Sequence, residues 1–257
     1  MGDIIYALPS MRKASRIHGQ KIQLALCIDQ PAQYNESHPL GAVMLNRTVA
    51  EMSVPLFNSL DFIGEVLITS DRVKTDYNFD LFRTVNRQYT GHISKWVTYV
   101  YPELTCDLSE PIYIGPYEKH DKIVFNRTQR YHGNNFDYLS IREYAPQMVF
   151  VGLESEYNII RKKLPGMEYH HVKDFLELAM FIRGSKFFVG NQSMAFALAE
   201  IMKVPRCVEV CRGAHNVIPT GANGYEAWTI GNLKQILDGN INNNVTGEPI
   251  GIEEDVR

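Results

Sequence analysis

The second half of the sequence constrains the fold most, because short apolar runs alternate there with segments of helical period. Met148–Val151 reads as a strand that ends in a turn at Gly152, and the residues after it read as a helix closed by Gly166. Lys186–Gly190 reads as a further strand. Strands that alternate with helices in this way are typical of a parallel sheet. The sequence therefore predicts an α/β protein.

The same alternation continues on both sides of these elements. In the segment 170–185, Phe175, Leu178, Ala179 and Ile182 recur at helical spacing. The pattern predicts further strands at 122–126 and 205–211, helices at 170–185, 191–204 and 233–239, and a frayed tail from residue 240. We interpret the second half as a Rossmann-like unit.

The first half shows the pattern less clearly. It predicts a helix at 8–19 that stops at Gly19, strands at 21–29 and 64–71, a helix and loop at 49–63, and a helix followed by connecting structure at 72–108. Pro111 and Pro116 mark a linker, which puts a domain boundary near residue 115. We expect one domain at 1–115 and a second, with a short tail, at 116–257.

The chain opens with a segment that raises a question of its own. Gly2 and Asp3 have the composition of a tight turn, and Pro9 and Ser10 precede a stretch rich in basic residues. A strand would normally lead into such a turn, yet none precedes it in the sequence given. The sequence therefore predicts a turn at Gly2 and Asp3 and leaves the role of the aspartate to be explained.

Composition excludes several classes of function. The net charge of -3 and the pI near 6.2 give no general attraction for nucleic acid. No apolar run approaches the roughly 20 residues that span a bilayer. The N-terminus also lacks the pattern of a signal peptide, so we expect a cytoplasmic protein without a transmembrane segment. The four cysteines lack the partners that complete a zinc site, and we expect reduced, structural thiols and no bound metal.

Two polar segments follow predicted strands and are the main candidates for ligand binding. Asn191, Gln192 and Ser193 stand where a strand gives way to a helix, so their side chains and the free backbone N–H groups suit an anion such as phosphate. The alternative is that Asn191 or Ser193 only caps the helix, and the residue types do not decide between the two.

The second segment is the loop after the strand at 122–126. Arg127 and Arg130 flank Thr128 there, and two guanidinium groups with a hydroxyl suit the recognition of a diphosphate. The alternative is a solvated loop with surface arginines. His132 lies near the two arginines and is a better candidate for function than His170 and His171, for which a capping or surface role is favoured.

At these segments the sequence resembles the nucleotide-sugar glycosyltransferases of the heptosyltransferase type (glycosyltransferase family 9). "GDIIYALPSMRKA" at 2–14 is similar to the Gly-Asp, apolar stretch and Leu-Pro that these enzymes carry near their N-terminus. "FIRGSKFFVGNQSMAFALAEIMKVPRCVEV" at 181–210 is similar to their donor-site segment, and "FNRTQRY" at 125–131 to their loop near the donor phosphates. The resemblance is thin between residues 40 and 115.

The resemblance implies a GT-B fold, in which two Rossmann-like domains hold the donor and the acceptor. The first domain would be abbreviated, because its usual leading strand is absent from the sequence given. Asp3 matches the family's general base, which takes a proton from the acceptor hydroxyl. Arg127, Thr128, Arg130 and the segment 191–193 would bind the diphosphate of a nucleotide sugar, with no cofactor and no metal. The transfer would invert the anomeric centre.

One departure from the family limits what the resemblance implies. The family's donor loop usually reads Asp-Ser/Thr-Gly with a His three residues beyond, whereas Gln192, Ser193, Met194 and Ala197 occupy these places here. Heptose specificity is therefore not transferred to this chain. A glycosyltransferase that acts on a glycan or another hydroxyl acceptor is the leading hypothesis, and a non-catalytic binding or structural protein that retains the fold is the alternative. A sugar-nucleotide epimerase has no residue in its support.

Overall fold

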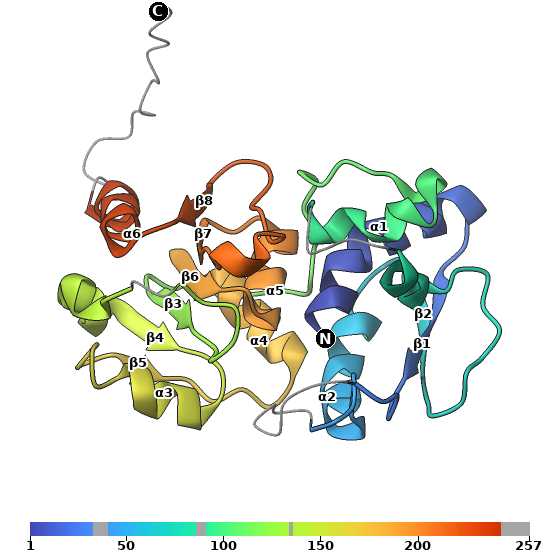
Figure 1. Ribbon diagram of the computed structural model, residues 1–257, viewed down its shortest axis with the longest axis horizontal. Coiled ribbons are helices and arrows are strands. Elements are labelled where there is room, and N and C mark those ends of the chain that lie inside the picture. The colour runs from blue at the N-terminus through green and yellow to red at the C-terminus, as the bar shows by residue number, and fades with distance from the viewer. Residues whose placement is uncertain (33–40, 86–90, 134–135, 243–257) are drawn as a thin grey trace, which may run out of the picture.

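The larger of two sheets has six parallel strands. A computed structural model describes residues 1–32, 41–85, 91–133 and 136–242. The strands are β3 (Ile123–Asn126), β4 (Met148–Phe150), β5 (Glu168–Tyr169), β6 (Phe187–Asn191), β7 (Arg206–Glu209) and β8 (Gly224–Ala227) (Figure 1). Their order in space is β5-β4-β3-β6-β7-β8, so the chain starts in the middle of the sheet, builds one side and then crosses to build the other. This is the strand order of a Rossmann fold, and it confirms the α/β prediction.

Helices cover both faces of this sheet because successive side chains of its strands point to opposite sides. Ile123 and Phe125 of β3 lie in the apolar layer on one face, and Val124 lies in the layer on the other. The first face packs against α3 (Glu154–Ile160), α6 (Ile230–Leu237) and the 3₁₀ helix η5 (Tyr138–Gln147), and the second against α4 (Phe175–Gly184) and α5 (Met194–Met202). A π-helical turn, η7 (Asp238–Asn242), follows α6.

The first half of the chain contains a smaller parallel sheet of two strands. Its elements are α1 (Gly2–His18), β1 (Ile22–Cys27), α2 (Arg47–Asn58), β2 (Ile63–Thr69) and four 3₁₀ helices, η1 (Phe79–Thr84), η2 (Ile93–Lys95), η3 (Val97–Tyr99) and η4 (Pro102–Leu104). The strands predicted at 21–29 and 64–71 are confirmed. The helix predicted within 72–108 is wrong, since that segment forms only these short 3₁₀ turns among its described residues.

The turn predicted at Gly2 and Asp3 is also wrong. Helix α1 begins at Gly2, and the backbone N–H groups of Ile4 and Ile5 both donate to the carbonyl of Met1. Asp3 suits the first turn of a helix as well as it suits a tight turn, because its negative charge faces the positive end of the helix dipole. The helix continues through Pro9 and ends, as predicted, at Gly19, whose φ of 63° is left-handed.

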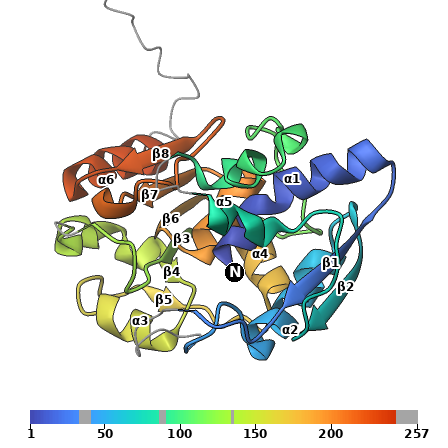
Figure 2. The ribbon, with the colours of Figure 1, turned by 45° about the vertical axis from the view of Figure 1, so that its right-hand side comes forward.

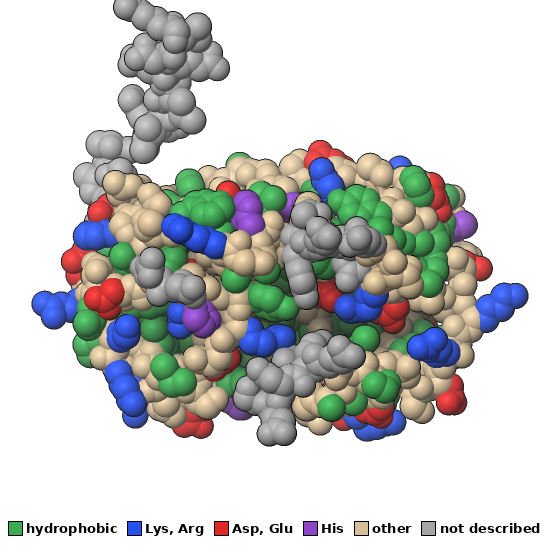
Figure 3. Space-filling view, in the orientation of Figure 1, with side chains coloured by type: hydrophobic (Ala, Val, Ile, Leu, Met, Phe, Trp, Pro, Cys, Tyr) green, Lys and Arg blue, Asp and Glu red, His purple; other side chains and the backbone are tan. Residues whose placement is uncertain are grey.

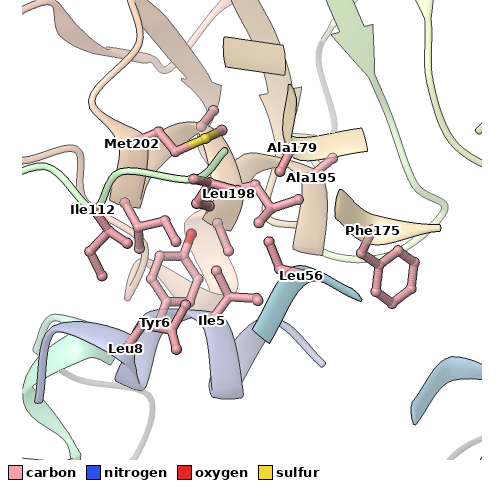
Figure 4. Close-up of a cluster of buried hydrophobic side chains, with 14 of the residues drawn as sticks. Ile5, Tyr6, Leu8, Leu56, Ile112, Phe175, Ala179, Ala195, Leu198 and Met202 are labelled. Carbon is pink, nitrogen blue, oxygen red and sulfur yellow. The ribbon is translucent and has the colours of Figure 1, made fainter. Parts of the chain in front are cut away.

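One apolar cluster joins the helices of the two halves (Figure 4). Ile5, Tyr6 and Leu8 of α1 face Leu198 and Met202 of α5 across the centre of the cluster. All residues of α5 after Met194 are buried, because the helix lies between the larger sheet and α1. In both ribbon views the start of α1 lies in the middle of the molecule, between the two sheets (Figure 2).

The predicted linker runs through this region as an irregular segment without strand or helix. Arg183 of α4 donates from Nη1 to the carbonyls of Ile114 and Gly115, both at 2.9 Å, and its guanidinium lies 4.4 Å from the ring centre of Tyr117. The boundary near residue 115 and the domains 1–115 and 116–257 stay predictions. The predicted tail lies outside the described residues from residue 243 onward, and within the described ranges no helix is both long and apolar enough to cross a membrane.

Candidate functional site

The carboxyl ends of β3 and β6 form the point where the strand order of the larger sheet reverses. In open α/β sheets ligands bind outside the carboxyl ends of the strands at such a point. Residues 127–131, called here the switch-point loop, follow β3, and Asn191–Ser193 lead from β6 into α5. The structure therefore brings together the two segments that the sequence marked for phosphate binding.

Asn191 holds the switch-point loop in place. Its side chain is fully buried, and Oδ1 accepts a hydrogen bond from the N–H of Thr128 at 2.9 Å. Its Nδ2 donates to the carbonyl of Thr128 at 3.1 Å and to the carbonyl of Arg130. The amide of Asn191 thus satisfies the backbone of the loop, which is a positioning role.

Arg127 is turned toward a buried carboxylate. Its Nε lies 3.0 Å from Glu209 Oε2 at the end of β7, and the Glu209 side chain is completely buried. Glu209 also accepts a hydrogen bond from the N–H of Gly133 at 2.6 Å and one from the hydroxyl of Tyr138. Burial and the Glu209 charge raise the pKa of Tyr138 well above its usual value, so this hydroxyl stays protonated and donates. Arg127 and Glu209 together fix the base of the loop.

Arg130 presents its charge to solvent, unlike Arg127. Its side chain is exposed, with the guanidinium 5.6 Å from the ring centre of Tyr131. Thr128 stands beside it, and its hydroxyl donates to the Arg130 carbonyl at 3.2 Å. Below the loop, Glu156 of α3 accepts a hydrogen bond from the N–H of Gln129 at 3.3 Å. Burial raises the pKa of the Glu156 carboxyl, while this hydrogen bond and the charge of Arg130 oppose the shift.

The residues that enter α5 complete this edge of the sheet. Ser193 caps the helix, since its Oγ accepts from the N–H of Phe196 at 3.1 Å. Gln192 donates from Nε2 to Asn216 Oδ1 at 2.7 Å. Two buried side-chain oxygens here, Gln192 Oε1 and Asn126 Oδ1, have no hydrogen-bond partner among the described residues. Unpartnered polar atoms are uncommon in native interiors, and both of these are acceptors, so they do not themselves suit an anion.

Asp3 lies in the other half of the molecule, in an ion pair that the sequence did not predict. Arg83 Nη2 is 2.9 Å from Asp3 Oδ2, and both side chains are about one-third exposed, at 34% and 38%. They line a cavity of about 790 Å³, called here the β1 groove, which lies between α1, β1 and the segment 72–84. The residues of the switch-point loop and the segment 191–193 do not line this groove.

The two parts of the candidate site both act electrostatically on the N-terminal amino group. Burial lowers the pKa of the Met1 amino group; the Asp3 carboxylate opposes this shift, while the charges of Arg83 and Arg130 add to it. Arg130 of the second half and Asp3 of the first therefore lie within electrostatic range of one point. Figure 3 shows basic and acidic side chains gathered in the middle of this face, where the surface is hollowed between the halves.

Some residues that contact the predicted site residues could have been identified from the sequence, and others could not. Glu209 is a carboxylate within a buried strand, which is rare without a partner and could have been noted. Arg83 lies in the irregular segment 72–108, where no pattern marks it. His132 stays a candidate without a described partner beyond the carbonyl of Gly133. In the described ranges, no group of three or more His, Cys, Asp or Glu side chains could hold a metal ion, and the four cysteines are free thiols.

Comparisons with known proteins identify similar folds but no similar sequence. No protein-family model matches the chain, and no curated protein matches it by sequence. The structure of E. coli heptosyltransferase WaaC with ADP is similar, with a TM-score of 0.60 and 12% identity over 93% of this chain and 97% of that one. The same enzyme with ADP-2-deoxy-2-fluoro heptose gives 0.58 and 12%, over 93% and 96% of the two chains.

A third solved structure agrees with these. A glycosyl transferase family 9 protein from Veillonella parvula has a TM-score of 0.55 and 10% identity, over 96% of this chain and 87% of that one. The resemblance to family 9 that the sequence indicated is thereby confirmed at the level of the fold. Identities this low carry no residue's role from those proteins to this one.

Proposed function

We propose that this protein is a glycosyltransferase of the GT-B type, which moves a sugar from a nucleoside-diphosphate donor to an acceptor hydroxyl. The observation that carries the proposal is the convergence of an exposed arginine and a helix N-terminus at one switch point, on a fold similar to that of an enzyme solved with ADP. In this proposal the domain 116–257 binds the donor. The domain 1–115, an abbreviated Rossmann-like unit, binds the acceptor.

The donor diphosphate would lie between Arg130 and the N-terminus of α5. A guanidinium pairs with phosphate oxygens in a forked geometry, and the first turn of a helix offers backbone N–H groups and a positive dipole end. The Thr128 hydroxyl and the Gln192 side chain border the same space. Arg127 and Asn191 would not contact the donor themselves, because their polar groups hold the switch-point loop in place.

Asp3 would act as the general base. Its carboxylate takes the proton of the acceptor hydroxyl while that oxygen forms a bond to the anomeric carbon, and the bond from this carbon to the diphosphate breaks. Attack from the face opposite the leaving group inverts the anomeric centre. Arg130 and the α5 N–H groups stabilise the charge of the departing diphosphate, so the proposed step involves no metal. Arg83 orients the Asp3 carboxylate.

Replacement of Asp3 by Asn separates catalysis from donor binding. We expect transfer to fall about 10²- to 10⁴-fold, the usual contribution of a general base. The dissociation constant for the nucleotide is expected to stay within about twofold, because the change lies outside the switch point. Transfer rates measured with saturating donor test this, and an unchanged rate would remove Asp3 from the mechanism.

Replacement of Arg130 by Ala tests the donor site. We expect ADP, used as the probe, to bind at least about tenfold more weakly, since a charge-assisted contact of this kind contributes about 1.5 kcal/mol or more. Arg142→Ala is the matched control, because Arg142 is an exposed arginine of η5 whose loss changes the net charge equally. Calorimetric titration of the three proteins measures the effect; equal weakening in both variants would contradict a specific contact.

A non-catalytic binding or structural role is the second candidate. It is favoured by Gln192, Met194 and Ala197, which stand where the family usually has other residues, and by the positioning role of Asn191. A thermal-shift series with nucleotides and nucleotide sugars distinguishes the two, since a ligand at 100 times its dissociation constant stabilises by about 2.7 kcal/mol. Stabilisation by a nucleotide sugar supports the enzyme; no shift with any of them supports the structural role.

A further inference from the structure

Two hydrogen bonds join the start of η2, in the first half of the chain, to an irregular segment of the second half. The N–H of Ile93 donates to the carbonyl of Asn216 at 2.8 Å. Nε2 of His92 lies 2.7 Å from the carbonyl of Ile218. His92 and Asn216 are only 7% and 5% exposed, so this junction lies in the interior. Its hydrogen bonds are therefore shielded from water, and the loss of one is not compensated by solvent.

Asn216 extends the junction to the candidate donor site. Its Oδ1 accepts a hydrogen bond from Nε2 of Gln192 at 2.7 Å, and Gln192 leads from β6 into α5. Asn216 thus binds the first half of the chain with its backbone and the entry to α5 with its side chain. A displacement of η2 relative to Asn216 therefore reaches Gln192 through a single residue.

The first turn of η2 requires the neutral form of His92. Its Nδ1 accepts a hydrogen bond from the N–H of Ser94 at 3.1 Å, while Nε2 donates to the carbonyl of the second half. An imidazolium carries a proton on both nitrogens and offers no acceptor, however the ring is turned. Protonation therefore leaves the N–H of Ser94, a residue only 5% exposed, without its partner. Because Ile93 lies between these two residues, its bond to Asn216 is disturbed as well.

The charged groups near His92 come from three parts of the chain. Burial lowers the pKa of His92, and the hydrogen bond to the second half opposes this shift. Glu200 of α5 also favours the imidazolium, whereas Lys203 of α5 and Lys95 of η2 disfavour it. From the linker, Glu110 lines a small cavity together with Glu200 and Lys203. Because the net effect lowers the pKa, His92 takes up its proton below about pH 6.5, the ordinary value for histidine.

We propose that protonation of His92 weakens nucleotide binding at the switch point, so that the junction between the halves is a proton-sensitive control of the candidate donor site. The inference rests on the proposed function, since it needs a nucleotide site beside Gln192. The neutral form holds Ile93 against Asn216 and thereby fixes Gln192, and the protonated form loosens this chain of contacts. By linkage, a bound nucleotide in turn disfavours protonation of His92.

Titration of ADP at pH 5.5 and pH 7.5 tests the coupling, because these values lie on either side of the ordinary pKa of histidine. Between pH 7.5 and pH 5.5 we expect Kd to rise at least about fivefold more for the wild type than for His92→Asn. Asparagine keeps an acceptor for the N–H of Ser94, as a good helix cap, but does not titrate. Protonation of ADP itself is common to both proteins and cancels in the comparison. Circular dichroism at each pH checks that both proteins are folded.

Two further variants identify the group and the route. His215→Asn is the matched control, since His215 is a second histidine, adjoins Asn216 and pairs with Glu226 at 2.5 Å. This variant should keep the pH dependence of the wild type within about twofold. Asn216→Ala retains His92 but lacks the bond to Gln192, so its pH dependence should fall to that of His92→Asn.

A measurement on the wild type alone keeps the question open to test where a variant does not fold. In the free protein, the side-chain amide resonances of Gln192 should shift with pH at the same midpoint as the ring resonances of His92. Different midpoints, or no shift of the Gln192 resonances, would contradict coupling between the two side chains.

Three outcomes of the ADP titrations would overturn the proposal. An equal rise of Kd in the wild type and in His92→Asn removes His92 from the control of the site. Loss of the pH dependence in His215→Asn assigns the control to His215. A wild-type pH dependence in Asn216→Ala rules out the route through Gln192. ADP that binds at neither pH contradicts the donor site itself, and this outcome is distinct from binding that does not depend on pH.

Discussion

At the scale of single residues, Glu209 organises the base of the candidate site, although it lies inside a strand. Its carboxylate binds Arg127, the N–H of Gly133 and the hydroxyl of Tyr138. These contacts come from three separate points of the chain and meet behind the switch-point loop. Arg127 is mostly buried and is held by this carboxylate. Arg130 is therefore the cation of the switch-point loop that faces solvent.

Glu209→Gln should lower the free energy of unfolding by about 3 kcal/mol, since it leaves Arg127 beside a neutral group in a mostly buried position. Glu168→Gln is the control: Glu168 pairs with Lys122 at 3.1 Å at the surface, where such pairs contribute about 0 to 1 kcal/mol. Urea denaturation measures both. Equal losses in the two variants would show that burial of the Glu209 pair has no special effect.

The sequence could predict part of the site at this scale. Strand ends followed by polar residues located the switch-point loop and the entry to α5, because position along a strand determines which edge of the sheet a residue reaches. It could not separate Arg127 from Arg130, or Asn191 from Gln192. That difference depends on Glu209 and on the backbone of the loop, whose positions relative to these side chains are set only by the folded sheet.

At the scale of elements, helix α5 connects the two halves. It is covered by the larger sheet on one side and by α1 on the other, and Leu198 lies at the centre of this packing. A helix in this position is expected to be mostly apolar, and "MAFALAEIM" is so except for Glu200, which is buried and pairs with Lys203 and Arg206. The same property explains why its type was easy to predict while its contact with α1 was not.

Leu198→Ala should lower the free energy of unfolding by about 2 to 5 kcal/mol, the range for a large-to-small change in a close-packed core. Leu67→Ala is the control, because Leu67 is 49% exposed on β2 and loses little buried surface. Thermal and urea denaturation of both variants measure the difference. A loss below about 1 kcal/mol for Leu198→Ala would contradict tight packing between α1 and α5.

Elements differ in how well the sequence indicates them, for physical reasons. The central strands β3, β4 and β6 are buried on both faces and read as largely apolar runs, whereas β7 is equally buried but begins with Arg206 and ends with Glu209. Strands β5 and β8 lie at the edges of the sheet, contain polar residues and escaped prediction. The start of α1 was missed because Gly-Asp has the same local preference for a turn as for the first turn of a helix.

At the scale of the whole molecule, the halves meet through polar contacts as well as through the apolar cluster. The N–H of Ile93 donates to the carbonyl of Asn216 at 2.8 Å. His92 Nδ1 accepts from the N–H of Ser94 at 3.1 Å, and its Nε2 donates to the carbonyl of Ile218 at 2.7 Å. This pair of hydrogen bonds requires the neutral imidazole. Asn216 in turn holds Gln192, so the contact between the halves is continuous with the candidate donor site.

Stability should fall as the pH drops below about 6.5, the ordinary pKa of histidine. Burial lowers the pKa of His92 in the folded protein, although its bond to the Ile218 carbonyl opposes the shift. The unfolded chain then binds the proton more readily between the folded and the ordinary pKa, so stability rises with pH across that window and levels off above it. Denaturation at pH 5.5 to 7.5 tests this. His92→Gln should reduce the slope, whereas His171→Gln, at an exposed position, should leave it unchanged.

The burial of α5 against α1 also has a consequence for synthesis of the protein on the ribosome. The apolar face of α1 is made well before the helix that covers it, which begins at Met194. At about 5 to 20 residues per second, the nascent chain carries that face uncovered for roughly 10 to 40 s. During this interval Ile5, Tyr6 and Leu8 are open to chaperones or to neighbouring chains on the same messenger RNA. Protection of this face during that interval should therefore affect how much of the newly made protein reaches its folded state.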